Sequence, residues 1–342
     1  MKIKKLHIKN FKSIADLEII EPNPFTVFVG PNGSGKSNIF EALEFYLKYK
    51  NSDNSIRLFG GETSITNANH NSETRIFKFI TEQWELNENS FEYKEAMLEY
   101  NQFTEDVNRD DDEISVKTAI KWPESVKKDY NQRSFYERQF SRLFIGNKDK
   151  QKVNYHDNLN LSFSTDNLEK VLKRILKNEG DKEEILDWLR LFIPEFEDVF
   201  IESSELSRTD TLIVKEKYSS KYFTKELLSD GTYNILALLT AVFQSDEPQF
   251  LCIEEPENGL NPKVIKELVG LFRYACEEKG HYIWLNTHSQ SLVSQLEAHE
   301  IILVNKKEGE TKVKQLKKDL NLYGLPMDEA WLSNALGGGL PW

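Results

Sequence analysis

The chain has 342 residues, of which 39% are hydrophobic and 29% are charged, which is typical of a folded globular protein with one large domain or two smaller ones. Its formal net charge of −12 excludes a surface that binds nucleic acid everywhere, so any DNA contact needs a local basic patch. The sequence has no apolar run of about 18 residues, and its basic N-terminal segment lacks the apolar core of a signal peptide. Because the two cysteines, Cys252 and Cys276, have no C-x-x-C spacing, we expect reduced thiols in a cytoplasmic protein without membrane contact.

Hydrophobic periodicity predicts strands, a turn and a helix at the start of the chain. Strands are predicted over residues 2–11, 17–20 and 25–29, a turn over residues 30–36 and a helix over residues 37–50. Residues 51–72 are polar and rich in turn-forming residues. Residues 75–101 alternate again between apolar and polar, which predicts an antiparallel pair of strands.

The rest of the chain changes from a helical pattern to an alternation of strands and helices. The acidic run at residues 105–113 predicts a solvated loop, residues 125–190 have helix-like periodicity, and residues 211–218 are strand-like. The last third predicts a helix after residue 232, a strand over 250–255, a helix over 263–278, a strand over 281–287, a helix over 291–298 and a strand over 300–306. Such alternation favours a largely parallel sheet with helices on its faces.

An octapeptide between the third strand and the first helix carries the most specific signal. GPNGSGKS at residues 30–37 fits the pattern G-x-x-x-x-G-K-[ST], and its place between a buried strand and a helix is the context that this phosphate-binding loop requires. We expect Lys36 to reach the β- and γ-phosphates of ATP and the Ser37 hydroxyl to bind Mg²⁺. The expected nucleotide-binding residues of the loop are Asn32, Gly33, Ser34, Gly35, Lys36 and Ser37.

Two carboxylates end a second apolar strand. FLCIEEPENGLNP at residues 250–262 places Glu254 and Glu255 at the C-terminal end of that strand, the edge where α/β sheets bind ligands. Adjacent strand residues point to opposite faces, so we expect different roles: Glu254 supports Mg²⁺, and Glu255 polarises the attacking water. NTHS at residues 286–289 ends the next strand, which makes His288 a candidate to contact the γ-phosphate or, equally, a structural histidine.

A second candidate phosphate site lies far from the first in sequence. LLSDGTYN at residues 227–234 places Ser229 and Gly231 at the start of a predicted helix. A helix N-terminus offers free N–H donors and the positive end of the helix dipole, both of which favour a phosphate. Two such sites in one chain raise the question of whose phosphate the second one holds.

The segments GPNGSGKS, LLSDGT, FLCIEEPE and NTHS occur together in this order in one known family. The chain resembles the ABC-type ATPase head of the SMC, RecF and OLD-like family, most closely the compact AAA-type ATP-binding proteins of anti-phage and abortive-infection systems. IKNFKSIADLEI at residues 8–19 resembles the N-terminal strand pair of that family. The resemblance is strong over residues 1–50 and 205–305 and weak over residues 51–204.

The resemblance implies a homodimer in which two heads dock head-to-tail around two ATP molecules, with higher oligomers possible. Ser229 and Gly231 would then cap the ATP of the partner. Residues 258–262 would form the D-loop that contacts the other head. Lys12 and Ser13 are tentative nucleotide contacts on the same grounds.

The resemblance also implies that Glu255 is the catalytic glutamate and that His288 is the switch histidine, with Glu254 supporting the metal ion. The glutamine that links nucleotide to lid in this family has no clear counterpart here. Gln83 is the nearest candidate, although an ordinary strand residue is the alternative interpretation.

The predicted fold class is therefore α/β, an ABC-ATPase head of the P-loop NTPase type. It would have a mixed or parallel sheet flanked by helices, N-terminal antiparallel strands and a short, mainly helical inserted lid. The expected parts are the two halves of the head at residues 1–101 and 206–320, the lid at residues 102–205 and a tail at residues 321–342.

Three functions are compatible with these motifs. The first is an ATPase that gates a partner effector, a nuclease or toxin encoded nearby, in an anti-phage defence system. The second is a RecF-like ATP-dependent clamp that binds DNA in repair, and the third is a regulatory ATP sensor that hardly turns over.

Two further segments bear on the choice of partner. Basic residues gather near aromatic ones in the middle of the chain, which indicates either a DNA-binding patch or a solvated helix face: Arg133, Arg138, Arg142, Lys148, Lys150 and Lys152, near Phe135, Tyr136 and Phe140. The tail carries Trp331, Leu332, Leu340 and Trp342 around three glycines, which predicts either exposed anchors for a partner or an end packed on the core.

Overall fold

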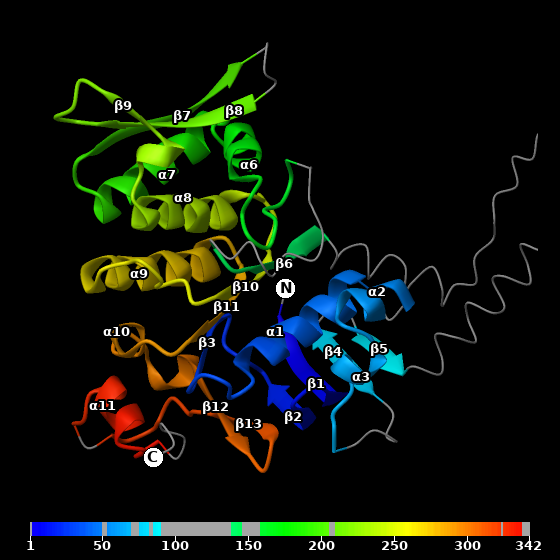
Figure 1. The fold of residues 1–342 in the computed structure, drawn as a ribbon. Helices are drawn as coiled ribbons and strands as arrows, with labels where there is room; N and C mark the ends of the chain where they lie inside the picture. Colours follow the sequence, from blue (N-terminus) through cyan, green and yellow to red (C-terminus); the bar gives the residue numbers. More distant parts are fainter. Residues whose placement is uncertain are drawn as a thin grey trace, which may run out of the picture.

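The computed structural model describes residues 2–49, 53–69, 75–81, 85–89, 138–145, 158–204, 209–322 and 324–336 (Figure 1). A six-stranded sheet runs through the middle of these residues in the order β13-β12-β3-β11-β10-β6. Its strands are β3 (Phe25–Val29), β6 (Phe140–Leu143), β10 (Phe250–Glu254), β11 (Tyr282–Thr287), β12 (Ile301–Lys307) and β13 (Glu310–Gln315). All neighbouring strands are parallel except β12 and β13. The α/β class and the largely parallel sheet are thus confirmed.

The central strands are apolar on both faces because both faces are covered. In β3, Phe25, Val27 and Val29 pack in one hydrophobic cluster, whereas Phe28 packs in the other. Strand β10 divides in the same way, with Leu251 and Ile253 on one face and Phe250 and Cys252 on the other. Continuous apolar runs of this kind are expected for parallel strands that are buried on both faces.

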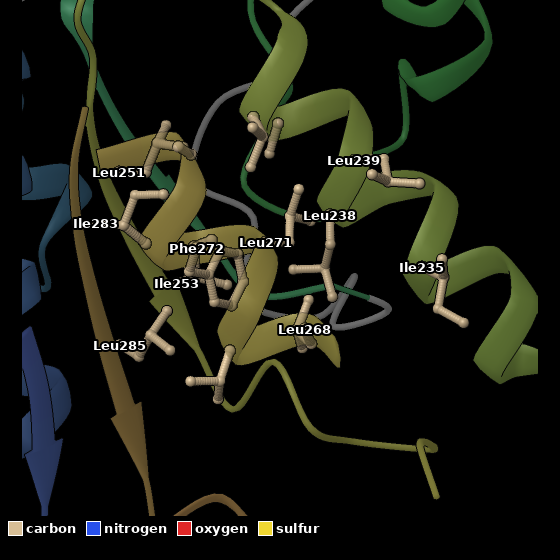
Figure 2. Packing of buried hydrophobic residues seen from close by; sticks show 14 of the residues in the cluster. Ile235, Leu238, Leu239, Leu251, Ile253, Leu268, Leu271, Phe272, Ile283 and Leu285 are labelled. Carbon is tan, nitrogen blue, oxygen red and sulfur yellow. The ribbon is translucent and has the colours of Figure 1, made fainter. Parts of the chain in front are cut away.

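Two stacked helices cover the first face of the sheet. Helix α9 (Pro262–Glu278) lies between the sheet and α8 (Asp230–Phe243), as Figure 2 shows. Leu268, Leu271 and Phe272 of α9 are at most 1% exposed, and Asn261 caps the helix by accepting from the backbone of Val264. Because α8 is buried over most of its length, its exposed N-terminal end at Ser229 is the part that can contact other molecules.

The second face of the sheet is covered by α1 and by an antiparallel sheet of order β2-β1-β4-β5. These elements are β1 (Ile3–Phe11), β2 (Ile14–Ile20), α1 (Lys36–Glu44), a π-helical turn (Phe45–Tyr49), α2 (Asp53–Leu58), α3 (Glu62–Ile65), β4 (Ile76–Thr81) and β5 (Glu85–Asn89). The expected N-terminal antiparallel strands are confirmed. The antiparallel pair expected over residues 75–101 is present as β4 and β5, but both strands lie within residues 76–89, and the second predicted strand, FEYKEAMLEY, lies outside the described residues. The prediction of irregular turns over residues 51–72 is wrong in part, because the short helices α2 and α3 lie there and bury Phe59 and Ile65.

A smaller lobe lies beyond α8 (Figure 1). Its elements are α6 (Leu168–Ile175), α7 (Glu179–Phe192), β7 (Phe196–Ser204), β8 (Thr209–Glu216), β9 (Tyr222–Thr224) and a 3₁₀ turn (Lys225–Leu227). The three strands form an antiparallel sheet whose Val199, Leu212 and Val214 pack in the same cluster as α6, α7 and α8. The range expected to form an inserted lid, residues 102–205, also supplies β6 to the central sheet; the domain boundaries themselves stay predictions.

The C-terminal region differs from the sequence-based expectation in two places. The helix expected over residues 291–298 is only α10 (Gln290–Val293), followed by a 3₁₀ turn (Ala298–Glu300). It ends early where the Ser294 hydroxyl donates to the carbonyl of Ser291, a local bond that competes with helix continuation. Helix α11 (Met327–Leu332) had no sequence signal that we recognised, and it buries Trp331 to 1% exposure.

The burial of Trp331 corrects the expectation that it is an exposed anchor for a partner. The indole lies in the main hydrophobic cluster, so this part of the tail is packed on the core. Leu332 is partly buried against the same cluster, while Leu340 and Trp342 lie outside the described residues. A search of the described residues for a helix long and apolar enough to cross a membrane found none.

Replacement of Trp331 tests whether α11 belongs to the core. Because a buried tryptophan leaves a large cavity, Trp331→Ala should lower the free energy of unfolding by about 3–5 kcal/mol. Urea denaturation followed by circular dichroism measures this loss. Leu325→Ala is the matched control, since Leu325 is 45% exposed just before α11 and should change stability by less than about 0.5 kcal/mol.

Candidate nucleotide-binding and catalytic site

The loop between β3 and α1 has the shape that binds phosphate. Gly33 and Gly35 have φ angles of 77° and 99°, a left-handed backbone that side chains with a Cβ rarely adopt. A Cβ on Gly33 would point into open space, whereas a Cβ on Gly35 would overlap the hydroxyl oxygen of Thr311. The loop is therefore open on the Gly33 side and closely packed on the Gly35 side.

A small polar cluster supports the loop from that packed side. Thr311 on β13 donates from Oγ1 to the carbonyl of Ser34 at 3.0 Å, and its Oγ1 lies 2.6 Å from the Ser13 hydroxyl. Asn38 on α1 donates from Nδ2 to the same Ser13 oxygen at 2.7 Å. Ser13 thus links the loop to its surroundings, while Lys12 forms an ion pair of 2.7 Å with Glu41. Whether either residue also contacts nucleotide stays a prediction.

Lys36 lies inside the loop with its ammonium group on two loop carbonyls. Its Nζ donates to Gly30 at 2.7 Å and to Pro31 at 3.0 Å. Burial lowers the pKa of Lys36, and the nearby carboxylates of Glu255, Glu257 and Glu254 oppose that shift. The ammonium group is thus held at the loop by backbone carbonyls, which carry only partial negative charge. A phosphate bound there would supply a full negative charge.

Two observations show that the loop fits a nucleotide phosphate. Ser34 is buried, yet its Oγ has no hydrogen-bond partner, so a hydroxyl donor inside the loop is available to a ligand. Asn32 and Gly33 are exposed on the open side. A phosphate group could therefore accept from the Ser34 hydroxyl and from Lys36 without displacing any bond between two side chains.

Ser37 and Glu254 meet across 217 residues of sequence. The Ser37 hydroxyl donates to Oε2 of Glu254 at 2.7 Å, and Asn286 at the end of β11 approaches the same hydroxyl at 3.5 Å. A hydroxyl oxygen beside a carboxylate is a hard oxygen donor pair of the kind that Mg²⁺ prefers. These residues fit the metal ion expected here, with Ser37 to ligate it and Glu254 to hold Ser37 and accept from its water ligands.

The chain turns sharply at Glu255, immediately after β10 ends. Its φ of 47° is left-handed, and its backbone N–H donates to Asn286 O at 3.0 Å and to Asn286 Oδ1 at 3.2 Å. The expectation that both glutamates continue the strand and face opposite ways is therefore wrong for Glu255. The turn brings its carboxylate to His288, whose Nδ1 lies 3.2 Å from Oε1, and to Asn258, whose Nδ2 donates to Oε2 at 3.1 Å.

Glu257 is a member of this site that we did not single out from the sequence. It is 7% exposed, its Oε1 accepts from the Thr287 hydroxyl, and its Oε2 has no partner among the described residues. Burial raises the pKa of Glu257 to about 7, an effect that its bonds to Thr287 and to its own backbone oppose and the Glu255 charge reinforces. The available signal was a third glutamate, two residues after Glu255, in the segment EEPE.

Arg142 is the second residue that sequence reasoning misplaced. It was a candidate for a DNA-binding patch, but it lies on β6, which pairs with β10, and it is only 8% exposed. Its Nε donates to Glu254 Oε1 at 2.7 Å, and its Nη1 donates to Glu44 Oε2 at 2.7 Å. The available signal was an arginine within the apolar run FSRLFI, where a charge needs a buried partner.

Of the other residues of the expected DNA-binding patch, the structure describes only Arg138 and Phe140. Phe140 is fully buried in the second cluster, and Arg138 is exposed beside it. The remaining residues of that set, Arg133, Phe135, Tyr136, Lys148, Lys150 and Lys152, lie outside the described residues, as does the lid candidate Gln83.

Ser229 caps α8 at a surface. Its side chain accepts from the Thr232 N–H at 3.1 Å and lies 2.9 Å from the Thr232 hydroxyl, and Ser229 is exposed. A Cβ on Gly231 would come within 2.8 Å of the carbonyl of Gly259, and Asn234 donates to the carbonyl of Asn258 at 2.8 Å. The start of α8 and the loop after Glu255 therefore form one continuous surface.

Comparison with known proteins identifies the family to which the chain belongs. The family described as "AAA domain, putative AbiEii toxin, Type IV TA system" matches residues 25–294. A crystal structure of an SMC head bound to the C-terminal winged-helix domain of ScpA resembles this fold with a TM-score of 0.53 and 16% identity, covering 93% of this chain and 98% of that one. At such low identity the likeness shows the fold alone.

Curated relatives match shorter segments. The chromosome partition protein Smc of Methanocaldococcus jannaschii is 53% identical over 45 residues, which is 13% of this chain and 4% of that protein. The DNA replication and repair protein RecF of Desulforamulus reducens is 27% identical over 94 residues, or 26% of this chain and 24% of that protein. The chain thus matches no more than about a quarter of the length of these relatives.

The pKa of Glu257 predicts a pH-dependent stability that one substitution removes. The folded protein keeps this proton up to about pH 7, while an unfolded glutamate releases it near 4.5. This contribution is therefore fully present below pH 4.5 and lost as the pH rises through 7, an effect of roughly 3 kcal/mol. Glu257→Gln should stabilise the protein relative to wild type at pH 8 but not at pH 5.

Urea unfolding in EDTA, without nucleotide, at both pH values measures the difference. The exposed Glu183→Gln serves as the control, with no change between the two pH values expected. Equal effects of Glu257→Gln at pH 5 and pH 8 would mean that the side chain is ionised throughout.

Proposed function

The chain belongs to this family of ABC-type ATPase domains, which is related to the heads of SMC and RecF proteins, and we propose that it binds and hydrolyses ATP with Mg²⁺. The observation that carries this proposal is the bond between Ser37 and Glu254 beside a glycine-rich loop that holds Lys36. These groups come from two distant segments and converge at the C-terminal edge of the sheet, where open α/β folds bind ligands.

Each residue of the site has a defined task in this proposal. The loop N–H groups, the Ser34 hydroxyl and Lys36 bind the phosphates, and Ser37 and Glu254 hold the metal ion. Mg²⁺, when bound, neutralises charge on the β- and γ-phosphates. Glu255 accepts a proton from the attacking water, and His288 and Asn258 orient its two carboxylate oxygens.

We further propose that the second phosphate site acts between two copies of the chain. Ser229 and Gly231 present a helix N-terminus on an exposed surface that is continuous with the loop after Glu255. In a two-fold head-to-tail dimer this surface would cap the ATP bound by the other copy. ATP then favours the closed dimer, and loss of the γ-phosphate allows it to open.

The biological role that we propose is control of a partner effector in anti-phage defence. The support is the family description, which names a putative AbiEii toxin and a type IV toxin–antitoxin system. The two heads would open and close with ATP turnover, and the activity of a bound nuclease or toxin could depend on which of the two states the dimer adopts. We propose that such an effector is encoded nearby and binds the dimer.

A DNA clamp is the second candidate, and the local match to a RecF protein favours it. The buried Arg142 and Phe140 remove two members of the patch on which DNA contact would depend. Duplex DNA binding by the Glu255→Gln protein with ATP at low salt would support the clamp. Its loss with added salt would indicate phosphate contacts.

Substitution of the proposed catalytic base separates binding from chemistry. Glu255→Gln keeps the size and one acceptor of the side chain but cannot take a proton, so hydrolysis should fall about 10²–10⁴-fold. Phosphate release measures the rate, and a fluorescent ATP analogue measures affinity, which should stay within about twofold of wild type. Normal turnover in this variant would remove Glu255 from the reaction.

Blocking the α8 surface tests the dimer. Ser229→Trp should leave ATP affinity unchanged, because the site on its own loop is intact, but should abolish dimers of the Glu255→Gln protein in ATP. Size-exclusion chromatography with light scattering provides the measurement. Ser333→Trp, at another exposed serine, is the control and should still dimerise; ATP-dependent dimers of Ser229→Trp would contradict the head-to-tail arrangement.

A further inference from the structure

The metal side of the site rests on a buried cluster of three charged side chains. Arg142, Glu254 and Glu44 are each at most 8% exposed. Arg142 contacts Glu254 through Nε at 2.7 Å and through Nη2, and it contacts Glu44 through Nη1 at 2.7 Å. Its guanidinium carbon also lies 5.0 Å from the centre of the Phe163 ring. Every side of the arginine is therefore occupied.

The geometry of three elements produces this cluster. Arg142 pairs with Cys252 in the parallel β6–β10 register, and Glu254 follows two residues later on the same face of β10. Ser37 and Glu44 lie on the same side of α1, because seven residues correspond to about two helical turns. The arginine thus links the far end of α1 to the strand that carries Glu254.

The two oxygens of Glu254 consequently have different partners. Oε1 accepts from Arg142, and Oε2 accepts from the Ser37 hydroxyl. Both guanidinium contacts, from Nε and Nη2, go to Oε1, so the carboxylate is held by donors on both of its oxygens, Arg142 at Oε1 and Ser37 at Oε2. With Oε1 held in this way, Oε2 faces Ser37 and the loop.

We propose that Arg142 is a positioning residue for Mg²⁺ binding, which holds Glu254 so that Ser37 and Glu254 present their oxygens to the metal ion. This inference rests on the proposed ATPase function. It assigns a role to a strand of the inserted region that the phosphate-loop and carboxylate motifs do not include. Outer contacts of this kind commonly change metal affinity 10- to 100-fold.

Arg142 could affect Mg²⁺ binding through its positive charge as well as by orienting Glu254. A double substitution separates these two effects. With one cation and two carboxylates the cluster carries a net charge of −1. Arg142→Met alone would leave two buried carboxylates without a cation, which is expected to destabilise the fold. Arg142→Met combined with Glu44→Gln keeps the net charge of −1 on Glu254 and removes only the contacts that orient it.

The test is a titration of MgCl₂ with N-methylanthraniloyl-ATP as the fluorescent probe, compared with the affinity for the same probe in EDTA. In the double variant we expect the half-saturating Mg²⁺ concentration to rise about 10- to 100-fold, and the dissociation constant in EDTA to stay within twofold of wild type. Circular dichroism establishes that the variant is folded.

A second arginine–glutamate pair provides the matched control. Arg273 on α9 donates to Glu300 from Nε and Nη2, both at 2.7 Å, and Glu300 directly precedes β12, at the edge of the sheet opposite the loop. Arg273→Met with Glu300→Gln should change neither the Mg²⁺ titration nor the EDTA affinity. An unchanged half-saturating Mg²⁺ concentration in the Arg142 double variant would overturn the proposal, as would an equal loss of affinity in EDTA.

Arg142→Lys decides the matter if the double variant does not fold. Lysine keeps the charge but offers no planar pair of donors, so the half-saturating Mg²⁺ concentration should still rise at least threefold. A value equal to wild type would overturn the proposal. If wild type itself bound the probe without any effect of Mg²⁺, the ATPase proposal would fail instead, and the two outcomes are thus distinguishable.

Discussion

The hydrogen bond from Ser37 to Glu254 joins the two halves of the site, and most of the fold serves to bring its two ends together. Ser37 lies in the first turn of α1, which follows β3 through the loop at residues 30–35, and Glu254 ends β10. Strand β11 lies between β3 and β10, and all three are parallel, so their C-terminal ends meet at one edge. Asn286 ends the intervening strand at the same edge and approaches the Ser37 hydroxyl.

Because adjacent strand residues face opposite ways, Glu254 and Glu255 could not both serve this edge in a regular strand. The left-handed backbone at Glu255 solves this problem. Such a conformation in a residue other than glycine costs of order 1–3 kcal/mol and persists only where neighbours hold it. Asn286 does so through two acceptors for the Glu255 N–H, which ties the loop after β10 to the neighbouring strand β11.

Sequence alone predicted the parts of this protein that depend on local patterns. The loop at residues 30–37, the strands over 25–29 and 250–255, the second of which ends one residue early in the structure, and the parallel sheet follow from motif, periodicity and alternation. The turn at Glu255 could not be predicted, because two consecutive glutamates after an apolar run look like a strand end. Arg142 was misread for a similar reason: a basic residue near aromatic ones predicts a surface patch unless the strand partner that buries its charge is known.

The buried groups found by the structure share one electrostatic cause. Four carboxylates, on Glu44, Glu254, Glu255 and Glu257, gather around two cations, Lys36 and Arg142. Burial penalises the charge of a carboxylate most where donors do not compensate it, and one residue of the group shows this effect. That residue is Glu257: the Thr287 hydroxyl satisfies only one of its oxygens, whereas both oxygens of Glu254 accept from donors.

Glu257 holds its proton up to about pH 7, and Glu254 and Glu255 lie beside it in the EEPE segment. Their charges are the ones that the chemistry needs, since Glu254 faces Ser37 and Glu255 faces the attacking water in the proposed reaction. Three glutamates can therefore lie close together in EEPE for two reasons. Arg142 donates to Glu254, and burial raises the pKa of Glu257 to about 7, so that Glu257 is uncharged below that pH.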